Sequence, residues 1–593
     1  MCGITGILDF KKKIKDPLLL INKLNELNKS RGPDDRGTWS NNDKNIFFGH
    51  TRLSVIDLTK NGKQPFLSYD KKISLIFNGE IYNFKDLKKI LIQKNYIFAS
   101  NTDTEVILHS YLEWGIDFID KLRGMFSIAI WDENLKKLFL IKDQFGIKPL
   151  YYSADSNFFC FSSSIKSLIN SKLVSNKRSS KSLTNYLLWG NTKDPDTIYD
   201  KIKSVEKGTY VVVDQNNNFF IKRYSDLIEN IQNIEGYNFS NKDEAKSYLK
   251  EIIHETVNYH LNSDANLGLA LSSGLDSNLI LDNIKPEFNE KIKTLTVDFN
   301  IDGTIKDEIE IAKKFSSEKK ILHKVVNLDQ LNLQQELKYF FNEMDTPSND
   351  GFNTYILSKL AKDNNVKVLL TGIGADEIFM GYPSFNRAKK YLNILKLISK
   401  FNYKKMPKKT ISYFVKKFNF NPKNSEIFDI KSLLDLFLLS RRLFLDDEVK
   451  EILYEYQQDI DNNRLPPLTV HQDFYKLDTN QQLMYLEIEH YLCPKLLKDS
   501  DWASMANSVE LRTPFVDWEF FKKYLKLFKS NVTVDKKFIY ETFKKSLPKE
   551  LENRKKSGFG IPHNYLLKEM GHKTYSKNGL KDWSLVSLKN YFN

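Results

Sequence analysis

Short apolar runs separated by turn residues fill roughly the first 170 positions of the 593-residue chain. The runs at 45–57, 71–83, 124–132, 136–143 and 157–164 are rich in β-branched and aromatic side chains. Strands at this close spacing are typical of stacked antiparallel sheets rather than of βαβ units. We therefore predict an N-terminal α+β domain that is built from stacked antiparallel sheets.

The pattern then changes. A helical stretch at 244–261 leads into the apolar strand 266–271, a loop and a further helix, and two more apolar runs follow at 293–299 and 366–370. Strands that alternate with helices indicate a parallel sheet. We predict an α/β C-terminal domain, which continues beyond about residue 380 as a mainly helical and basic region without internal repeats.

A polar, Asn-rich segment near 210–240 separates the two patterns, as expected of a connector. A chain of 593 residues also exceeds what one hydrophobic core usually serves. We predict a first domain at 2–190, a connector at 191–240 and a second domain at 241–593.

Composition excludes several classes of protein. Apolar residues make up 41% and charged residues 28% of the chain, as in an ordinary globular protein. No apolar stretch approaches the roughly 18 residues of a membrane span, and the first residues do not resemble a secretory signal. We therefore expect a cytoplasmic protein with no membrane partner. Three cysteines, Cys2, Cys160 and Cys493, are too few and too scattered for a disulfide framework or a zinc site.

The net charge of +14 raises the question of nucleic acid. The excess is mostly Lys, spread in pairs over helical segments, without a concentrated basic tract or interleaved Arg and aromatic residues. Nucleic acid is therefore not an expected partner.

Cys2 is the first candidate for chemistry. If Met1 is removed, the free α-amino group of Cys2 titrates near about pH 8 and can take the thiol proton directly or through water. Gly3 and Gly6 allow close backbone approach, and an apolar strand follows. A cysteine at position 2 is more often incidental, so the neighbouring motifs decide whether it is a nucleophile.

Three further segments supply the groups that glutamine hydrolysis would require. Arg52 is a fork-shaped cation suited to an α-carboxylate, and Asp103 can pair with an ammonium group. Asn78 and Gly79 offer a side-chain amide and a backbone N–H that could form an oxyanion hole. Each residue alone is equally consistent with a turn, a cap or a surface ion pair.

Together these segments resemble the class II glutaminase domain, in which an N-terminal cysteine attacks the glutamine amide, forms a thioester and releases ammonia. The motifs that carry the resemblance are MCGITGI (1–7), RGPDDRG (31–37), HTRLSVID (50–57), NGEIYN (78–83), DTEVIL (103–108) and KDQFGIKPLYY (142–152). The resemblance implies a fold of the N-terminal-nucleophile type, with Cys2, Asn78 and Gly79 catalytic. It also implies a glutamine site made of Arg52, Leu53, Ser54, Val55, Ile56, Asn78, Gly79, Glu80 and Asp103.

The motif LALSSGLDSNLI predicts a strand, a loop of small residues and a helix. Ser272, Ser273, Gly274 and Ser277 can direct hydroxyl and backbone N–H groups at phosphate oxygens in front of the helix N-terminus. Asp276 is placed to bind Mg²⁺. The structural alternative is a Ser/Gly-rich turn with an Asp cap. The loop has no Lys and is therefore not a GxxxxGK[ST] P-loop.

The loop resembles the PP-loop of the ATP pyrophosphatases, and the chain as a whole resembles the glutamine-hydrolysing asparagine synthetases. The second resemblance is carried by KVLLTGIGADEIFMGY (367–382), DSDWASMANSVELRTPFVD (499–517) and RKKSGFGIP (554–562). It implies Mg²⁺ ligands at Asp276 and Asp376, and a catalytic Lys556 that stabilises charge on the acyl group and pyrophosphate. It further implies an ATP site made of Leu271, Ser272, Ser273, Gly274, Asp276, Ser277, Val297, Thr371 and Gly372.

The reaction that these resemblances imply joins ammonia to a carboxylate. The carboxylate attacks the α-phosphate of MgATP, which gives an acyl-adenylate and pyrophosphate. Ammonia freed at Cys2 then crosses the domain interface and displaces AMP. ATP and Mg²⁺ are the expected cofactors. The expected partners are glutamine, ATP and a carboxylate acceptor, which is aspartate by family, and a homodimer is one option for assembly.

The chain departs from the family pattern in its second loop. Asparagine synthetases usually read SGEGxDE there, whereas this chain reads TGIGADE, with Ile373 in place of the acid. The family's acid is assigned to deprotonation of ammonia or to orientation of the intermediate, and Ile373 can do neither. Two acceptors therefore stay open. One is aspartate, with Asp473 or another acid compensating, and the other is a different carboxylate, such as a sugar uronate in surface-polysaccharide synthesis.

Two functions from other classes are also open. A glutaminase or regulatory protein with an inactive ATP half is disfavoured by the intact Ser272, Gly274, Asp276, Asp376 and Lys556. A PP-loop enzyme that modifies nucleic acid is disfavoured by the glutaminase motifs and by the lack of a recognisable RNA-binding segment.

Overall fold

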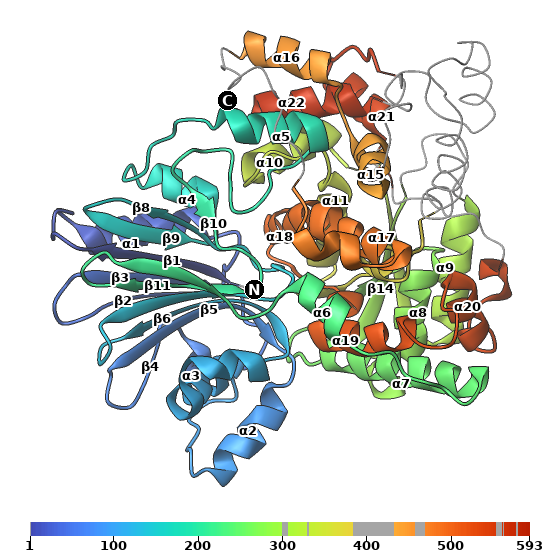
Figure 1. Cartoon of the computed structure of the whole chain (residues 1–593), viewed down its shortest axis with the longest axis horizontal. Helices are drawn as coiled ribbons and strands as arrows, with labels where there is room; N and C mark the ends of the chain where they lie inside the picture. Colours follow the sequence, from blue (N-terminus) through green and yellow to red (C-terminus); the bar gives the residue numbers. More distant parts are fainter. Residues whose placement is uncertain are drawn as a thin grey trace.

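The computed structural model describes residues 2–298, 306–328, 331–382, 432–456, 469–552, 560, 562–576 and 579–592. Two antiparallel sheets form one side of the molecule, and a parallel sheet with its helices forms the other (Figure 1). This architecture confirms the predicted fold class. We refer to residues 2–223 as the N-terminal region and to residues 242–592 as the C-terminal region. Within the ranges given above, no helix is long and apolar enough to cross a membrane.

The first sheet has the strand order β10-β8-β9-β1-β3-β2. Its strand β1 (Gly3–Asp9) pairs antiparallel with β3 (Ile46–Arg52), and Gly3 lies opposite Thr51. The other strands are β2 (Asp35–Ser40), β8 (Tyr151–Ala154), β9 (Phe158–Ser162) and β10 (Lys203–Ser204). Helices α1 (Pro17–Leu27) and α4 (Ile165–Asn170) pack on its outer face.

The second sheet has the strand order β12-β11-β7-β6-β5-β4. Its strands are β4 (Phe66–Leu67), β5 (Ile73–Ile81), β6 (Gly124–Asp132), β7 (Lys137–Lys142), β11 (Thr209–Asp214) and β12 (Phe219–Arg223). Helices α2 (Phe84–Gln93) and α3 (Asp103–Trp114) follow β5 and share one apolar cluster with it.

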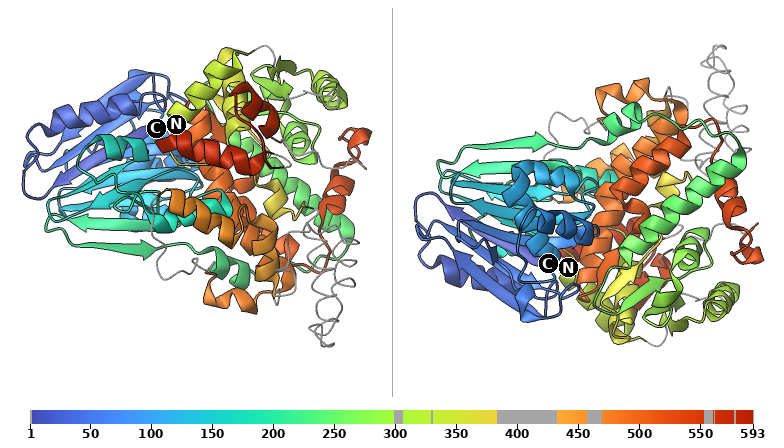
Figure 2. Two further views of the ribbon diagram at one scale, coloured as in Figure 1. Left: turned by 90° about the horizontal axis from the view of Figure 1, so that it is seen from above. Right: turned by 90° about the horizontal axis from the view of Figure 1, so that it is seen from below.

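The two sheets pack face to face, because successive side chains along each strand point to opposite faces of its sheet and one face of each sheet is apolar. Phe48 points into the space between the sheets, where it meets Ile76 and Trp131 of the second sheet. The neighbouring Phe47 points the other way and packs with Ile21 of α1. Figure 2 shows the sheets as stacked layers on one side of the molecule.

Three strands fall inside 191–240, the range predicted as a connector. β11 and β12 form a hairpin in which Val211 pairs with Ile221. Polar residues form the turn of this hairpin. Asn217 adopts a left-handed backbone conformation (φ 66°), and the Asp214 carboxylate accepts a hydrogen bond from the Asn218 N–H (2.9 Å). The Asn-rich composition therefore marks a hairpin turn at this point, and the second sheet extends to Arg223.

The parallel sheet has the strand order β15-β14-β13-β16-β17. Its strands are β13 (Leu267–Ala270), β14 (Ile292–Asp298), β15 (Leu322–Asn327), β16 (Val368–Leu370) and β17 (Glu510–Arg512). The three central strands are almost entirely buried, as expected where helices cover both faces of a sheet. The helices named below are α7 (Lys242–His260), α8 (Leu275–Asn283), α9 (Lys306–Glu318), α11 (Phe352–Asp363) and α12 (Ala375–Ile378).

The remaining helices surround this sheet and fill the contact between the two regions. They are α5 (Ser180–Trp189), α6 (Leu227–Asn233), α10 (Leu333–Glu343), α15 (Leu433–Arg441), α16 (Asp446–Glu455), α17 (Thr479–Glu487), α18 (Lys498–Met505), α19 (Trp518–Phe528), α20 (Lys536–Phe543), α21 (His563–Glu569) and α22 (Leu580–Phe592). A π-helical segment, η9 (Ile488–Leu497), runs directly into α18. Helix α18 carries Asp501, and strand β17 carries Glu510 and Arg512, three charged side chains that reach the N-terminal region.

Candidate active sites

Cys2 lies immediately before β1 and is 7% exposed. Its backbone N–H donates to the Asn78 Oδ1 (2.9 Å), and its carbonyl oxygen accepts from the Arg31 Nε (3.2 Å). Burial raises the pKa of the Cys2 thiol. A nucleophilic thiolate at this position therefore needs a base close by.

A small open pocket lies beside Cys2. It brings together most of the residues predicted to bind glutamine, although they come from β3, the loop that follows it, β5 and the start of α3. Its lining contains Cys2, Arg52, Leu53, Val55, Ile56, Gly62, Gln64, Phe77, Gly79, Glu80, Thr102, Asp103, Thr104 and Glu510. The predicted Ser54 and Asn78 do not line it. The Ser54 N–H donates to the Asp34 Oδ2 (2.8 Å), and Asn78 lies behind Cys2.

The Asn78–Gly79 pair occupies the last part of β5, opposite Ser127 and Phe126 of β6. Gly79 has φ 155°, and a Cβ there would lie 2.1 Å from the Met125 carbonyl oxygen. Only glycine fits this close approach. The Asn78 amide nitrogen lies 3.4 Å from the Ser127 Oγ. The strand therefore holds both residues close to Cys2, with Gly79 in the lining of the pocket and Asn78 in contact with the Cys2 backbone.

Arg52 ends β3 and lines the pocket. Its Nη1 donates to the Thr59 carbonyl oxygen (2.7 Å), and its Nη2 donates to the carbonyl oxygens of Ile56 (3.2 Å) and Asp57 (2.5 Å). Arg52 thus shapes the loop that supplies Leu53 to Ile56. A substrate carboxylate that binds here would share the Arg52 guanidinium with the backbone carbonyl oxygens of this loop.

Asp103 is the first residue of α3, and its carboxylate accepts from the Ile81 N–H (3.1 Å). Burial, together with the nearby Glu510, raises the pKa of Asp103 to about 6. The carboxylate is therefore ionised at neutral pH and can hold an ammonium group, but it takes up a proton under mildly acidic conditions.

Glu510 is the first residue of β17, and through it the C-terminal region contributes a side chain to the lining of the pocket. It forms an ion pair with the Arg512 Nε (2.6 Å), and the Arg512 Nη2 lies 3.0 Å from the Glu80 Oε2. All three side chains are buried. Sequence reasoning placed Glu510 and Arg512 inside a family motif but gave them no role, because nothing in the motif indicates that β17 reaches the glutamine site.

The residues predicted for ATP lie at one edge of the parallel sheet. Leu271 follows β13, Val297 is near the end of β14, and Thr371 follows β16, and these three strands are neighbours. The carboxyl edge of a parallel sheet is where such folds bind nucleotides. The structure therefore brings the three predicted segments together.

Hydrogen bonds inside the loop from Ser272 to Ser277 hold its shape. The Ser277 Oγ accepts from the Ser272 N–H (3.2 Å), and the Gly274 N–H donates to the Ser272 Oγ (3.1 Å). The Asn278 Nδ2 donates to the carbonyl oxygens of Ser272 (2.9 Å) and Gly274 (2.7 Å). Asn278, which was not predicted as a site residue, closes the loop in front of α8. Ser273 is buried within this loop.

Asp276 and Asp376 face each other across the two loops. Lys536 of α20 lies between them, with its Nζ 3.0 Å from the Asp276 Oδ1 and 2.5 Å from the Asp376 Oδ1. Two carboxylates that share one ammonium group lie close enough to share one metal ion. This pair fits Mg²⁺, which binds one or two carboxylates and takes its other ligands from water and phosphate. In the described residues, no group of three or more metal-ligating side chains occurs.

Lys536 was not predicted as a site residue. It belongs to a helix far along the chain, in a segment without a recognisable motif. The two carboxylates raise the pKa of Lys536 and keep it charged. The predicted Lys556 lies outside the described residues.

Ile373 is partly buried between two apolar clusters in the second loop. Two acids, Asp376 and Glu377, follow Ile373 in helix α12. The Glu377 Oε1 accepts a hydrogen bond from the Tyr382 hydroxyl. Burial raises the pKa of Glu377 to about 7. Asp473, the other acid considered, forms ion pairs with Lys476 (2.6 Å) and His471 (3.9 Å).

Two family models match the chain. The one described as a glutamine amidotransferase domain covers residues 1–225, and the one described as asparagine synthase covers residues 248–593.

The chain is similar to three relatives from Bacillus subtilis (strain 168). Glutamine-hydrolysing asparagine synthetase 1 is 29% identical over 589 residues, which are 96% of this chain and 88% of the relative. Synthetase 3 is 27% identical over 98% of this chain and 89% of the relative. Synthetase 2 is 33% identical over 65% of this chain and 52% of the relative.

The fold and the two sites define an amide ligase that hydrolyses glutamine. The chain belongs to the asparagine synthase family, since that family's model matches more than half of its length.

The pKa of Asp103 gives a prediction for glutamine hydrolysis. If Asp103 holds the substrate ammonium, its protonation removes that contact, so the slope of log kcat/KM for glutamine against pH should steepen by about one below pH 6. Asp103→Asn should lower kcat/KM throughout and abolish the steepening. Glu113→Gln, at the other end of α3, is the matched control. A steepening that survives in Asp103→Asn would assign the titration to another group.

Proposed function

We propose that this enzyme takes ammonia from glutamine at Cys2 and transfers it to a carboxylate that ATP has activated, with release of AMP and pyrophosphate. The observation that carries the proposal is the coexistence of two sites in one chain. A pocket beside Cys2 holds the predicted glutamine residues, and a Ser/Gly loop at the edge of the parallel sheet lies beside paired carboxylates.

At the glutaminase site, the Cys2 thiolate attacks the side-chain amide carbon of glutamine. The Asn78 amide and the Gly79 N–H stabilise the oxyanion that forms. Asp103 pairs with the substrate ammonium, and Arg52 with its carboxylate. Once Met1 is removed, the Cys2 α-amino group accepts the thiol proton and later passes it to the leaving ammonia. Water then hydrolyses the thioester and releases glutamate.

At the ATP site, the loop from Ser272 to Ser277 and the N-terminus of α8 bind the phosphates. Asp276 and Asp376 would hold Mg²⁺, which neutralises phosphate charge when bound. Lys536, which pairs with both carboxylates, would supply further positive charge beside the phosphates. The acceptor carboxylate attacks the α-phosphorus, pyrophosphate leaves, and ammonia displaces AMP from the resulting acyl group.

Ammonia passes between the two sites along the contact of the two regions. At that contact, residues of both regions line a small cavity of about 10 Å³, which is about the space of one water molecule. Transfer inside the protein keeps ammonia unprotonated, and only the unprotonated form has the lone pair that attacks the acyl carbon.

The acceptor is aspartate by family, and Ile373 is the observation that favours a second candidate. An apolar side chain in place of the family's acid suits a bulkier or less charged carboxylate, such as a sugar uronate. Glu377 is engaged with Tyr382, and Asp473 with Lys476 and His471. Neither acid is therefore an evident replacement for the missing one.

Cys2→Ala tests the glutaminase half of the proposal. It should lower glutamine-dependent synthesis by at least about 10³-fold, since the nucleophile is lost, and leave ammonia-dependent synthesis near the wild-type rate. Amide formation from glutamine and from ammonium chloride is measured in parallel, with Cys160→Ala as the control. Normal rates from glutamine in Cys2→Ala would refute the nucleophile assignment.

The nucleotide products test the ATP half. One AMP and one pyrophosphate should form for each amide, and synthesis should require Mg²⁺. Asp276→Asn should abolish synthesis and spare glutamine hydrolysis, whereas Asp282→Asn on the same helix, whose partner is Lys319 (2.7 Å), should retain both. ADP and phosphate as products would exclude this chemistry.

The acceptor is tested by pyrophosphate release with ATP and ammonia, screened over aspartate, other amino acids and nucleotide-sugar uronates. General acid–base help is typically worth about 10²–10⁴-fold in rate. Aspartate should therefore be a slow substrate that Ile373→Glu accelerates and Ile373→Leu does not, and another carboxylate should react faster. Fast, saturable release with aspartate that Ile373→Glu leaves unchanged or slows would establish plain asparagine synthesis.

A further inference from the structure

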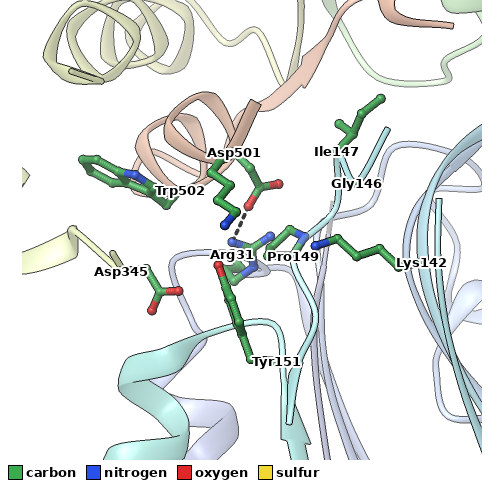
Figure 3. A pocket seen from close by; sticks show the side chains of 10 residues that line it. Arg31, Lys142, Gly146, Ile147, Pro149, Tyr151, Asp345, Asp501 and Trp502 are labelled. Carbon is green, nitrogen blue, oxygen red and sulfur yellow. Dashed lines mark hydrogen bonds and ion pairs between the residues drawn. The ribbon is translucent and has the colours of Figure 1, made fainter. Parts of the chain in front are cut away.

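Arg31 contacts the backbone of the proposed nucleophile within the N-terminal region and, across the contact of the two regions, the side chain of Asp501. Arg31 is the first residue of the RGPDDRG motif (31–37), and it does not line the pocket beside Cys2. Its Nε donates to the Cys2 carbonyl oxygen (3.2 Å), and its Nη1 donates to the Asp501 Oδ2 of α18 (2.8 Å). Figure 3 shows Arg31 reaching toward Asp501, with Tyr151 beside it. One guanidinium thus joins Cys2 to a helix of the C-terminal region.

The backbone of Cys2 depends on such side-chain contacts. The pairing of β1 with β3 begins at Gly3, opposite Thr51, so the ladder does not include Cys2. Asn78 holds the Cys2 N–H, and Arg31 holds its carbonyl oxygen. These two contacts lie on either side of the Cα that carries the thiol. A shift of about 1 Å in a reacting group can cost about 10²-fold in rate, so loss of either contact should be visible in catalysis.

Burial explains why Arg31 depends on Asp501. Both side chains are less than a tenth exposed, and Lys148, whose Nζ lies 3.4 Å from the Asp501 Oδ1, is buried with them. A buried cation needs a nearby anion. The other carboxylate at this cavity, Asp345, accepts hydrogen bonds from the Ser164 hydroxyl and the Ile165 N–H. The direct ion pair that orients Arg31 is therefore with Asp501.

Helix α18 also contacts the interior of the C-terminal region. Two residues before Asp501, the Asp499 Oδ2 accepts from the Ser348 hydroxyl (2.5 Å), in the segment that leads to α11. Within one turn of α18, Asp499 thus binds a loop of the C-terminal region, and Asp501 binds Arg31 of the N-terminal region.

We propose that Arg31 is a positioning residue for Cys2 and that Asp501 sets its orientation. A side chain of the C-terminal region then controls the geometry of the nucleophile in the N-terminal region, through the sequence Cys2 carbonyl, Arg31 guanidinium, Asp501 carboxylate. The inference rests on the proposed function in that it takes Cys2 as the nucleophile. It adds two residues that do not touch glutamine and nonetheless determine its rate of hydrolysis.

Asp501→Asn is the first test, because it keeps the shape of the side chain and removes its charge. The full-length variant should show kcat for glutamine hydrolysis lowered at least about tenfold, with KM within about twofold, since the residues that hold glutamine are untouched. Inactivation by 6-diazo-5-oxonorleucine, a glutamine analogue that alkylates the nucleophile, should slow by the same factor. Ammonia-dependent pyrophosphate release should persist, which shows that the variant is folded.

Asp194→Asn is the matched control. Asp194 also pairs with α18, through Lys498 (2.5 Å), and has no contact with Arg31 or Cys2 among the described residues. It should leave kcat for glutamine near the wild-type value. An equal loss in Asp194→Asn would mean that general damage to the contact between the regions, and not the orientation of Arg31, lowers the rate.

A double-mutant cycle separates positioning from a structural role. If the two residues act as one unit, Arg31→Gln with Asp501→Asn should be no slower than Arg31→Gln alone. Arg31→Lys should recover only part of the rate, because a single ammonium does not reproduce the fork that joins two acceptors.

Three results would overturn the inference: additive losses in the cycle, a KM effect without a kcat effect, or an unchanged kcat in Asp501→Asn. The baseline is wild-type hydrolysis of glutamine that Cys2→Ala abolishes. If that baseline is absent, the proposed function fails and the inference falls with it. If the baseline holds and Asp501→Asn is unaffected, only the inference fails.

Discussion

The fully buried Arg512 connects the two sites of this enzyme. Its guanidinium lies against Glu80 of the glutamine pocket and Glu510 of its own strand, and its Nη1 donates to the carbonyl oxygens of His260 (2.8 Å) and Asn262 (2.6 Å). Its own carbonyl oxygen accepts from the Thr371 N–H (2.9 Å), at the base of the second ATP loop. Removal of one partner from such a buried network typically costs about 3–5 kcal/mol, because the other charges stay buried without compensation.

This network has a consequence for the protonation of the pocket. Glu80, Glu510 and Asp103 bring three carboxylates near one guanidinium, and the shorter contact of Arg512 is with Glu510. Glu510 therefore stays ionised. Burial and the neighbouring carboxylates raise the pKa of Glu80 well above its usual value. The charge of this pocket therefore depends on Arg512, a residue of the C-terminal region.

The sequence predicted those parts of the fold and sites that local patterns encode. Alternating strands, the Asn78–Gly79 pair and the Ser272–Ser277 loop are short segments whose chemistry can be recognised without knowing their neighbours. Glu510 and Lys536 could not be assigned in this way, because each acts on residues more than a hundred positions away. The hairpin at 209–223 was predicted as connector for a related reason. Its Asn-rich turn dominates the composition, whereas its pairing with β7 is a tertiary contact.

The arrangement also explains why the two reactions occur in one chain. Each loop that would bind a reacting group is shaped by its own hydrogen bonds, as with Ser277 and Asn278 at the ATP loop and Arg52 at the glutamine pocket. The contacts between the regions include aromatic contacts such as Phe145–Trp518 and also buried ion pairs such as Arg123–Asp517 (2.8 Å) and Arg31–Asp501 (2.8 Å). Buried ion pairs add little net stability and fix relative orientation more than they hold surfaces together. The structure thus combines two sites that are shaped by their own hydrogen bonds with buried ion pairs between the regions, and the ammonia transfer proposed above would depend on how the two sites face each other.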